Sequence, residues 1–158
     1  MTAPGPYSGG CQCGAVRFTV AKLGRASLCH CRMCQKAFGG IGGALVTVEG
    51  LSWTRGAPSR FASSNKAQRG FCAACGTPLT YEAPDGVALA IGAFDHPEEL
   101  APAVQWGTEA KLPYVDDVPG LPGHGTLDDQ DAASFIVHIV SYQHPDHDTE
   151  TWPPEQAS

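Results

Sequence analysis

Leu28-Cys29-His30-Cys31-Arg32-Met33-Cys34 brings three cysteines into six consecutive residues in the N-terminal half of the chain. Two further pairs flank this segment at long range, Cys11-Gln12-Cys13 before it and Cys72-Ala73-Ala74-Cys75 after it. Thiolates are soft ligands that suit zinc, and a C-x-C or C-x2-C spacing lets a chain present two sulfurs to one tetrahedral ion. The seven cysteines therefore predict zinc binding.

Seven sulfurs divide most simply into a group of four and a group of three. A zinc ion held by four thiolates is closed and structural, whereas a catalytic zinc keeps one position for water or substrate. The spacing fits best a closed site on the two flanking pairs and an open site on the central trio, that is, Cys11, Cys13, Cys72 and Cys75 for the first, and Cys29, Cys31 and Cys34 for the second. The spacing also allows two thiols of the trio to join the C-x2-C pair, which would strand Cys11 and Cys13. A redox-labile or metal-free thiol cluster is the alternative interpretation of the trio.

The residues around the central trio predict a strand that enters a helical turn. Residues 26–29 have strand character, and residues 31–38 are expected to turn helically before Gly39-Gly40, which places Cys31 and Cys34 on one side. His30 has two interpretations, a fourth metal ligand or a packing and hydrogen-bonding residue. An extended backbone turns its ring away from the neighbouring thiols, which favours the second.

Composition and charge limit the classes of protein to which this chain can belong. A length of 158 residues with 42% hydrophobic content fits one domain with its own core. A formal charge of −6 and the absence of a Lys/Arg run argue against nucleic-acid binding. No apolar run approaches a membrane span, and residues 1–6 lack the basic and apolar blocks of a secretion signal. We therefore expect a cytoplasmic protein, and in a reducing compartment a cysteine-dense chain more often binds metal than forms disulfides.

Short β-like segments separated by Gly and Pro predict a mainly β fold of short antiparallel strands with zinc knuckles and few helical turns. Residues 1–6 are expected to be a flexible lead-in, residues 7–142 one domain, and residues 143–158 a loosely ordered tail. The His144-Pro145-Asp146-His147-Asp148 run of this tail has two interpretations, a metal site or a solvated segment, and its place in the tail favours the second. We expect a helical turn over residues 95–100 with Asp95 as its N-cap, a loop over residues 113–125 and a strand over residues 134–142. The aromatic side chains of the short strands are expected in the core, namely Trp53, Phe61, Phe71 and Trp106.

Three blocks of the sequence carry a family resemblance. Residues 10–14 (GCQCG), 29–35 (CHCRMCQ) and 69–79 (RGFCAACGTPL) resemble, in order and separation, the signature blocks of the glutathione-dependent formaldehyde-activating enzyme family, which includes the centromere protein V-like proteins. The resemblance extends more faintly from Gln105-Trp106 through residues 117–122, so that it covers roughly residues 7–122. The chain departs from the pattern at Gln105, where many members carry histidine, and in its longer C-terminal part.

The resemblance implies a fold, two metal sites and an activity. The fold is a compact β fold of the Mss type, with a structural zinc on the four flanking thiols and a second zinc on the central trio. The activity is a carbon–sulfur lyase or synthase reaction that condenses formaldehyde with glutathione to S-(hydroxymethyl)glutathione. The substrates would be a small aldehyde and a thiol, with glutathione as co-substrate.

The chemistry of carbon–sulfur bond formation agrees with a three-thiolate zinc site, and a non-catalytic function is the alternative. Three thiolates give a zinc centre a net charge of −1, which suits delivery of bound sulfur better than hydrolysis. A glutathione site would need a cation for each carboxylate, and the available arginines are Arg17, Arg25, Arg32, Arg60 and Arg69. The alternative is a non-catalytic, zinc-stabilised module that binds a protein partner on the same scaffold.

Overall fold

A computed structural model describes residues 5–128 and 134–153 of the chain. Within these residues the domain consists of short strands, one short α-helix and several 3-10 helices. The strands are β1 (Tyr7–Gly10), β2 (Arg17–Val20), β3 (Lys22–Cys29), β4 (Gly43–Glu49), β5 (Ser52–Arg55), β6 (Ser59–Ala62), β7 (Gln68–Phe71), β8 (Pro78–Ala83), β9 (Gly86–Ala90) and β10 (Val104–Trp106). The helices are α1 (Arg32–Phe38), η1 (Ile91–Ala93), η2 (Pro97–Glu99), η3 (Thr108–Ala110), η4 (Pro113–Gly120) and η5 (Ser134–His138).

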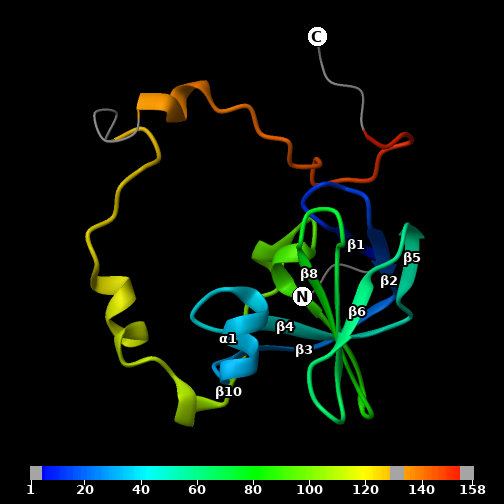
Figure 1. Ribbon diagram of the computed structural model, residues 1–158, viewed down its shortest axis with the longest axis horizontal. Coiled ribbons are helices and arrows are strands. Elements are labelled where there is room, and N and C mark those ends of the chain that lie inside the picture. The colour runs from blue at the N-terminus through cyan, green and yellow to red at the C-terminus, as the bar shows by residue number, and fades with distance from the viewer. Residues whose placement is uncertain (1–4, 129–133, 154–158) are drawn as a thin grey trace.

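The strands form two sheets (Figure 1). The smaller sheet has the order β1-β2-β5, and the larger has the order β10-β3-β4-β9-β8-β7-β6. Neighbouring strands are antiparallel except for β10, which pairs in parallel with the end of β3 and places Trp106 opposite Cys29. The mainly β fold predicted from the sequence is therefore confirmed.

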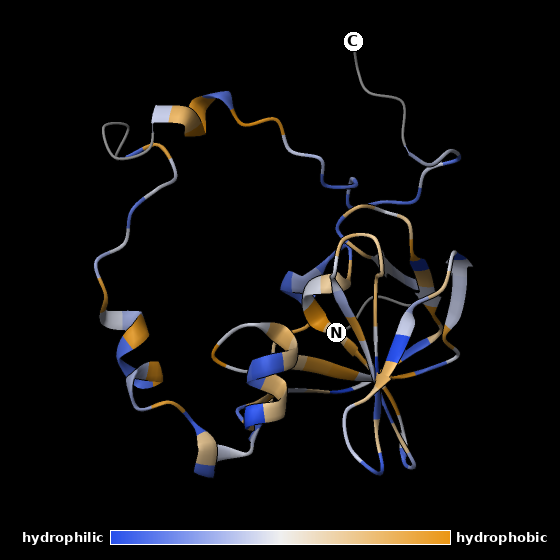
Figure 2. Cartoon of the chain, viewed as in Figure 1, coloured by the Kyte–Doolittle hydropathy of each residue, from blue (hydrophilic) through white to orange (hydrophobic). Residues whose placement is uncertain are grey.

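The core lies between the two sheets. Phe18 of β2 is fully buried and makes edge contacts with Phe94, at 5.1 Å between ring centroids, and with Trp53, at 6.0 Å. Leu79 and Leu89 contribute buried side chains from β8 and β9. Figure 2 shows the apolar residues of the strands gathered inside the domain, where their burial supplies most of the stabilising free energy.

Several local predictions were wrong. Residues 134–138 form η5 instead of a strand, because β-prone side chains need a neighbouring strand to pair with and this segment has none among the described residues. Residues 113–120 form η4 instead of an irregular loop. Phe61 and Trp106 are about half exposed instead of buried, since both lie on edge strands. Asp95 does not cap the turn that follows it, because His96 occupies the N-cap position of η2.

The C-terminal residues after 143, which the sequence predicts as a loose tail, contact the domain. His144 is buried, and its backbone N–H donates to the carbonyl oxygen of Gln12 at 2.7 Å. The Trp152 indole N–H donates to the carbonyl oxygen of Cys13 at 2.6 Å. Gly14, at φ +79°, makes room for this segment, because a Cβ there would lie 2.2 Å from His144 Cδ2. These contacts are polar and join residues far apart in the sequence, so no apolar periodicity predicts them.

Arg17 joins the domain to this segment through two carboxylates. Its guanidinium donates two hydrogen bonds to Asp95, at 2.8 and 2.7 Å, and reaches Asp148 at 2.6 Å. The Arg17 and Asp95 side chains are almost fully buried. Burial opposes ionisation of Asp95, but hydrogen bonds from Arg17 and Ser8 outweigh it and hold the pKa of this carboxyl below its ordinary value of 3.8.

Replacing Asp95 by asparagine is expected to lower the free energy of unfolding at pH 7 by about 3 kcal/mol. This is the lower end of the usual cost of breaking a buried ion pair, because Asp148 still pairs with Arg17 in the variant. The folded-state pKa of Asp95 is depressed, so the native protein keeps this contribution above pH 3.8 and loses it as the pH falls through the folded-state pKa. Urea unfolding at pH 7 and at pH 3 measures both effects. If the difference in unfolding free energy between Asp95→Asn and the native protein were the same at pH 7 and pH 3, the stabilising role assigned to ionised Asp95 would be wrong.

None of the helices in the described residues has the length and apolar character that crossing a membrane requires.

Candidate metal centres and cavity

The first thiol cluster joins the N-terminal knuckle to the β7–β8 hairpin. Its sulfurs all lie within 4.8 Å of one another and belong to Cys11, Cys13, Cys72 and Cys75. Cys11 Sγ lies 3.6 Å from Cys13 Sγ, which in turn lies 3.9 Å from Cys72 Sγ. Tetrahedral zinc–sulfur bonds of about 2.3 Å imply sulfur–sulfur edges of about 3.8 Å, so the two measured distances fit such an ion.

Backbone and hydroxyl groups shape this cluster. The Val16 N–H donates to Cys11 Sγ at 3.2 Å, and Cys75 Sγ lies 3.1 Å from Thr77 Oγ1. Burial opposes ionisation of Cys75, yet hydrogen bonding to Thr77 and Cys13 lowers its pKa to about 6, while burial raises the pKa of Cys72. Four thiols this close repel one another once ionised, so a cation among them is what allows all four to be thiolates.

The second thiol cluster consists of Cys29 at the end of β3 and of Cys31 and Cys34 at the start of α1. Their sulfurs also lie within 4.8 Å of one another, and the group that the described residues form here includes no histidine or carboxylate. Cys31 is the N-cap of α1, and its sulfur accepts the Cys34 N–H at 3.4 Å. Burial opposes ionisation of Cys31, but this and further hydrogen bonds lower its pKa, whereas burial and the neighbouring thiols raise the pKa of Cys29 to about 12.

The structure thus groups the seven sulfurs four and three, and both groups can hold a metal ion. The four-sulfur group is complete as a tetrahedron. The three-sulfur group leaves one coordination position for another ligand, which is the arrangement of a catalytic zinc rather than a structural one. The donor set of both groups, all thiolate, suits zinc better than magnesium or calcium.

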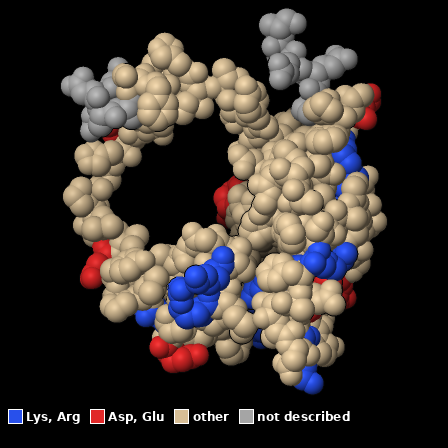
Figure 3. Space-filling model, viewed as in Figure 1, with Lys and Arg blue, Asp and Glu red and all other residues tan. Residues whose placement is uncertain are grey.

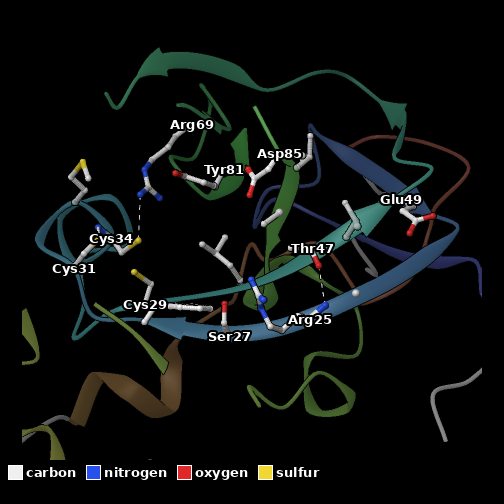
Figure 4. A pocket seen from close by; sticks show the side chains of 18 residues that line it. Arg25, Ser27, Cys29, Cys31, Cys34, Thr47, Glu49, Arg69, Tyr81 and Asp85 are labelled. Atoms are coloured by element: carbon white, nitrogen blue, oxygen red, sulfur yellow. Dashed lines mark hydrogen bonds between the residues drawn. The ribbon is translucent and has the colours of Figure 1, made fainter. Parts of the chain in front are cut away.

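The second cluster lies in the wall of a cavity of about 490 Å³. Arg25, Ser27 and Cys29 alternate along β3 and therefore point to the same side of the strand, into this cavity. Figure 4 shows Arg69 and Tyr81 on the opposite wall, with the Arg69 guanidinium directed at Cys34. Trp106 lines the mouth, where the Arg25 guanidinium lies 5.0 Å from its ring centroid.

Arg69 is a buried cation at the thiol cluster. Its side chain donates to Cys34 Sγ at 3.3 Å and to Ser63 Oγ at 2.9 Å, and the guanidinium lies 5.0 Å from the Tyr81 ring centroid. Only 4% of the residue is exposed, and within the described residues it forms no ion pair with a carboxylate. A buried charge is costly unless it is paired, so the contact with Cys34 and the open cavity beside it mark this guanidinium as a place where an anionic group would be stabilised.

The other arginines are engaged elsewhere. Arg17 pairs with Asp95, and Arg60 pairs with Glu82 on the surface. Arg32 hydrogen-bonds Gln35. Of the five arginines that the sequence offers for carboxylate binding, Arg25 and Arg69 line the cavity.

His30 and Gln35 hold the loop between the thiols. His30 is fully buried and turned away from the thiol cluster, with Nε2 2.8 Å from Gln105 Oε1, while its Nδ1 has no partner in the structure. The Gln35 side-chain amide donates to the His30 carbonyl at 2.6 Å and to the Ala110 carbonyl at 3.0 Å. Gly107, at φ +61°, passes so close that a Cβ there would lie 2.8 Å from Cys31 N. These contacts fix the backbone that carries Cys29 and Cys31.

We expect Gln35→Ala to weaken metal binding at the second cluster by about 10- to 100-fold, the usual effect of removing an outer partner of a ligand loop. Competition with a chromophoric zinc chelator measures this affinity. Lys36→Ala, one residue along α1 but exposed, is the matched control and should bind zinc as the native chain does. Equal zinc affinity in Gln35→Ala and Lys36→Ala would contradict the role assigned to Gln35.

Sequence reasoning named the seven thiols but assigned no role to Arg69 or Gln35. Arg69 was one of five candidate arginines, and its strand position alone does not say which element faces it. Gln35 follows Cys31 by four residues, so a helix over this segment puts the two on one face, which is the signal that would have found it.

Comparison with known proteins identifies the family. The family model described as "Glutathione-dependent formaldehyde-activating enzyme" matches residues 6–109, more than half of the chain. A crystal structure of a Rhodobacter sphaeroides protein is similar over 62% of this chain and 98% of that chain, with 22% sequence identity and a TM-score of 0.49. No curated protein matches the sequence. The matched region includes both thiol clusters and β10, and the chain belongs to the glutathione-dependent formaldehyde-activating enzyme family.

Proposed function

We propose that the protein is a zinc-dependent carbon–sulfur lyase or synthase that condenses formaldehyde with glutathione to S-(hydroxymethyl)glutathione. The observation that carries the proposal is the three-thiol cluster in the wall of the cavity, with a coordination position left for a reactant. Family membership supports the same reaction class.

The reaction forms one carbon–sulfur bond. The thiol sulfur adds to the aldehyde carbon, the carbon–oxygen double bond becomes a single bond, and the proton lost by the thiol ends on the new hydroxyl oxygen. Cys29, Cys31 and Cys34 would hold a zinc ion here, which would favour ionisation of the reacting thiol or polarise the carbonyl group.

Arg69 is placed to stabilise the charge that the reaction creates. Its guanidinium is buried beside Cys34 and lines the cavity, so an N–H can donate to the oxygen that gains negative charge as the new bond forms. The planar guanidinium acts here as a hydrogen-bond donor with a fixed fork of N–H groups. Ser63 and Tyr81 hold it in place.

Arg25 and Trp106 define the mouth of the cavity. Arg25 is exposed and stacked on the Trp106 ring, so its guanidinium is available to a carboxylate that approaches from solvent. Glutathione carries two carboxylates and an ammonium group, and Asp85 at the far end of the cavity offers a partner for the ammonium, whereas the Glu49 carboxylate there pairs with Lys22. The cavity therefore has charges of both signs for a zwitterionic thiol.

An exchange experiment tests the proposal, because formaldehyde and glutathione also react unaided. Carbon-13 NMR of labelled formaldehyde with glutathione at equilibrium gives the exchange rate between free and thiol-bound formaldehyde. The zinc-loaded protein is expected to raise this rate well above the uncatalysed value, and Cys31→Ser, which removes one thiol of the open cluster, is expected not to. The same rate with native protein and with Cys31→Ser would contradict the proposal and favour a binding module.

A further inference from the structure

Residues 112–128 and 134–143, here called the arm, expose most of the large apolar side chains that the described residues leave in solvent. The arm leaves the domain beside α1 and β10, runs clear of it, and returns to the N-terminal knuckle at His144 (Figure 1). Nine of the fourteen exposed large apolar side chains belong to it: Tyr114, Val118, Leu121, Leu127, Phe135, Val137, Ile139, Val140 and Tyr142. Monomers rarely expose apolar patches of more than a few hundred Å².

Three of these nine side chains lie in or directly after η4, namely Tyr114, Val118 and Leu121, and they are 40–63% exposed.

The η4 part of the arm combines an apolar column with an unpaired acid. In a 3-10 helix, residues three apart lie above one another, so Val118 and Leu121 form one column and Asp117 lies in the column beside it. Val118 is 40% and Leu121 63% exposed. Asp116 turns to Lys111, which its carboxylate contacts at 2.5 Å, while Asp117 makes no ion pair within the described residues.

The domain has a groove between α1 and β6 that combines apolar side chains with basic ones, where η4 combines apolar side chains with an acid. Its volume is about 400 Å³, and its floor includes Met33, which is 52% exposed, and Phe61, which is 47% exposed. Arg32 and Lys36 rim it, and α1 contains no acidic residue to neutralise them. Figure 3 shows Lys and Arg side chains gathered over α1 and acidic side chains on the arm at the place of η4.

We propose that residues 113–121 of one copy of the chain dock in the α1/β6 groove of a second copy, reciprocally, to form a two-fold dimer. Val118 and Leu121 contact Met33 and Phe61 of the second copy, and Asp117 pairs with its Lys36. Each chain carries both the acidic apolar segment and the basic apolar groove, so a two-fold axis satisfies both surfaces of both copies at once. A net charge of −6 opposes association elsewhere and makes this local complementarity decisive.

The dimer brings the partner's arm next to the cavity. Met33 lines both the α1/β6 groove and the cavity that contains Cys29, Cys31 and Cys34. A segment docked on Met33 therefore covers part of the outer wall of the cavity. The contact does not depend on the reaction proposed above.

Sedimentation equilibrium of the full zinc-loaded chain over a range of concentrations tests the dimer. The native protein is expected to dimerise, and Val118→Asp with Leu121→Asp, or Phe61→Glu, is expected to give monomers. All three positions are exposed, so circular dichroism should show an intact fold. Ala57→Asp, in an exposed turn outside both surfaces, is the matched control and should dimerise as the native chain does. A native protein that is monomeric at all concentrations would overturn the proposal.

A charge reversal tests the pairing itself. Asp117→Lys and Lys36→Asp are each expected to weaken dimerisation by about tenfold or more, and the double variant is expected to recover most of the loss because the pair is restored with its signs exchanged. The single-variant losses should shrink at high salt. Losses that simply add in the double variant would overturn the assigned contact.

Discussion

Cys72→Ser is expected to abolish the folded domain at 37 °C. Cys72 is buried, and its cluster connects the N-terminal knuckle to the β7–β8 hairpin. Removing one of four thiolates opens a structural site whose binding free energy is folding free energy, about 10–16 kcal/mol for isolated zinc-binding peptides. Losing half of this binding free energy would be comparable to the whole stability of a typical domain, which is about 5–15 kcal/mol. Thermal unfolding followed by circular dichroism measures the loss.

Cys31→Ser is the matched control for this change. It makes the same chemical substitution in the second cluster, which lies at a cavity wall and does not join distant strands. We expect a melting temperature within a few degrees of the native value for Cys31→Ser. If Cys72→Ser melted as the native protein does, the first cluster would not have the structural role assigned to it.

Arg69→Leu is expected to reduce the catalysed exchange of formaldehyde with glutathione by about 10²- to 10³-fold, the usual cost of losing a donor to a developing oxyanion. Arg69→Lys keeps the charge but loses the planar fork that reaches Cys34 and Ser63 together, so we expect it to recover a minor part of the rate. The loss should appear in kcat rather than in the KM for glutathione, because Arg69 contacts the cluster rather than the mouth of the cavity.

Two arginine variants serve as comparisons for Arg69. Arg60→Leu breaks a surface pair with Glu82 outside the cavity and should leave the exchange rate unchanged. Arg25→Leu should raise the KM for glutathione with little change in kcat, since Arg25 lies at the mouth. A loss in Arg69→Leu that is confined to KM, or zinc content that falls with it, would contradict a direct role in the reaction.

The spacing of the cysteines was enough to predict how the seven sulfurs group. C-x-C and C-x2-C are short, so each brings its two sulfurs together almost whatever the surrounding chain does. The grouping of the two flanking pairs is a long-range event, yet the count of seven leaves few divisions that strand no thiol, and the structure has the four-and-three division. Short β-like segments between Gly and Pro predicted the mainly β fold for the same local reason.

Features that depend on distant contacts were not predictable in this way. Arg69 reaches Cys34 across 35 positions, and Arg17 reaches Asp148 across 131. No sequence motif relates residues at either of these separations. His144 was assigned to a solvated tail, but it is buried because Gly14 leaves space for it, and a glycine so placed looks the same in sequence as any turn glycine. The strand expected over residues 134–142 failed because its β-propensity is not matched by a pairing edge.

Zinc per chain, measured by elemental analysis on the native protein and on Cys31→Ala, tests the central claim that one thiol cluster is closed and the other open. We expect two ions per native chain and one per Cys31→Ala chain, with unchanged far-ultraviolet circular dichroism, because the four-thiol cluster is untouched. One ion per chain in both proteins, or two in both, would contradict the account.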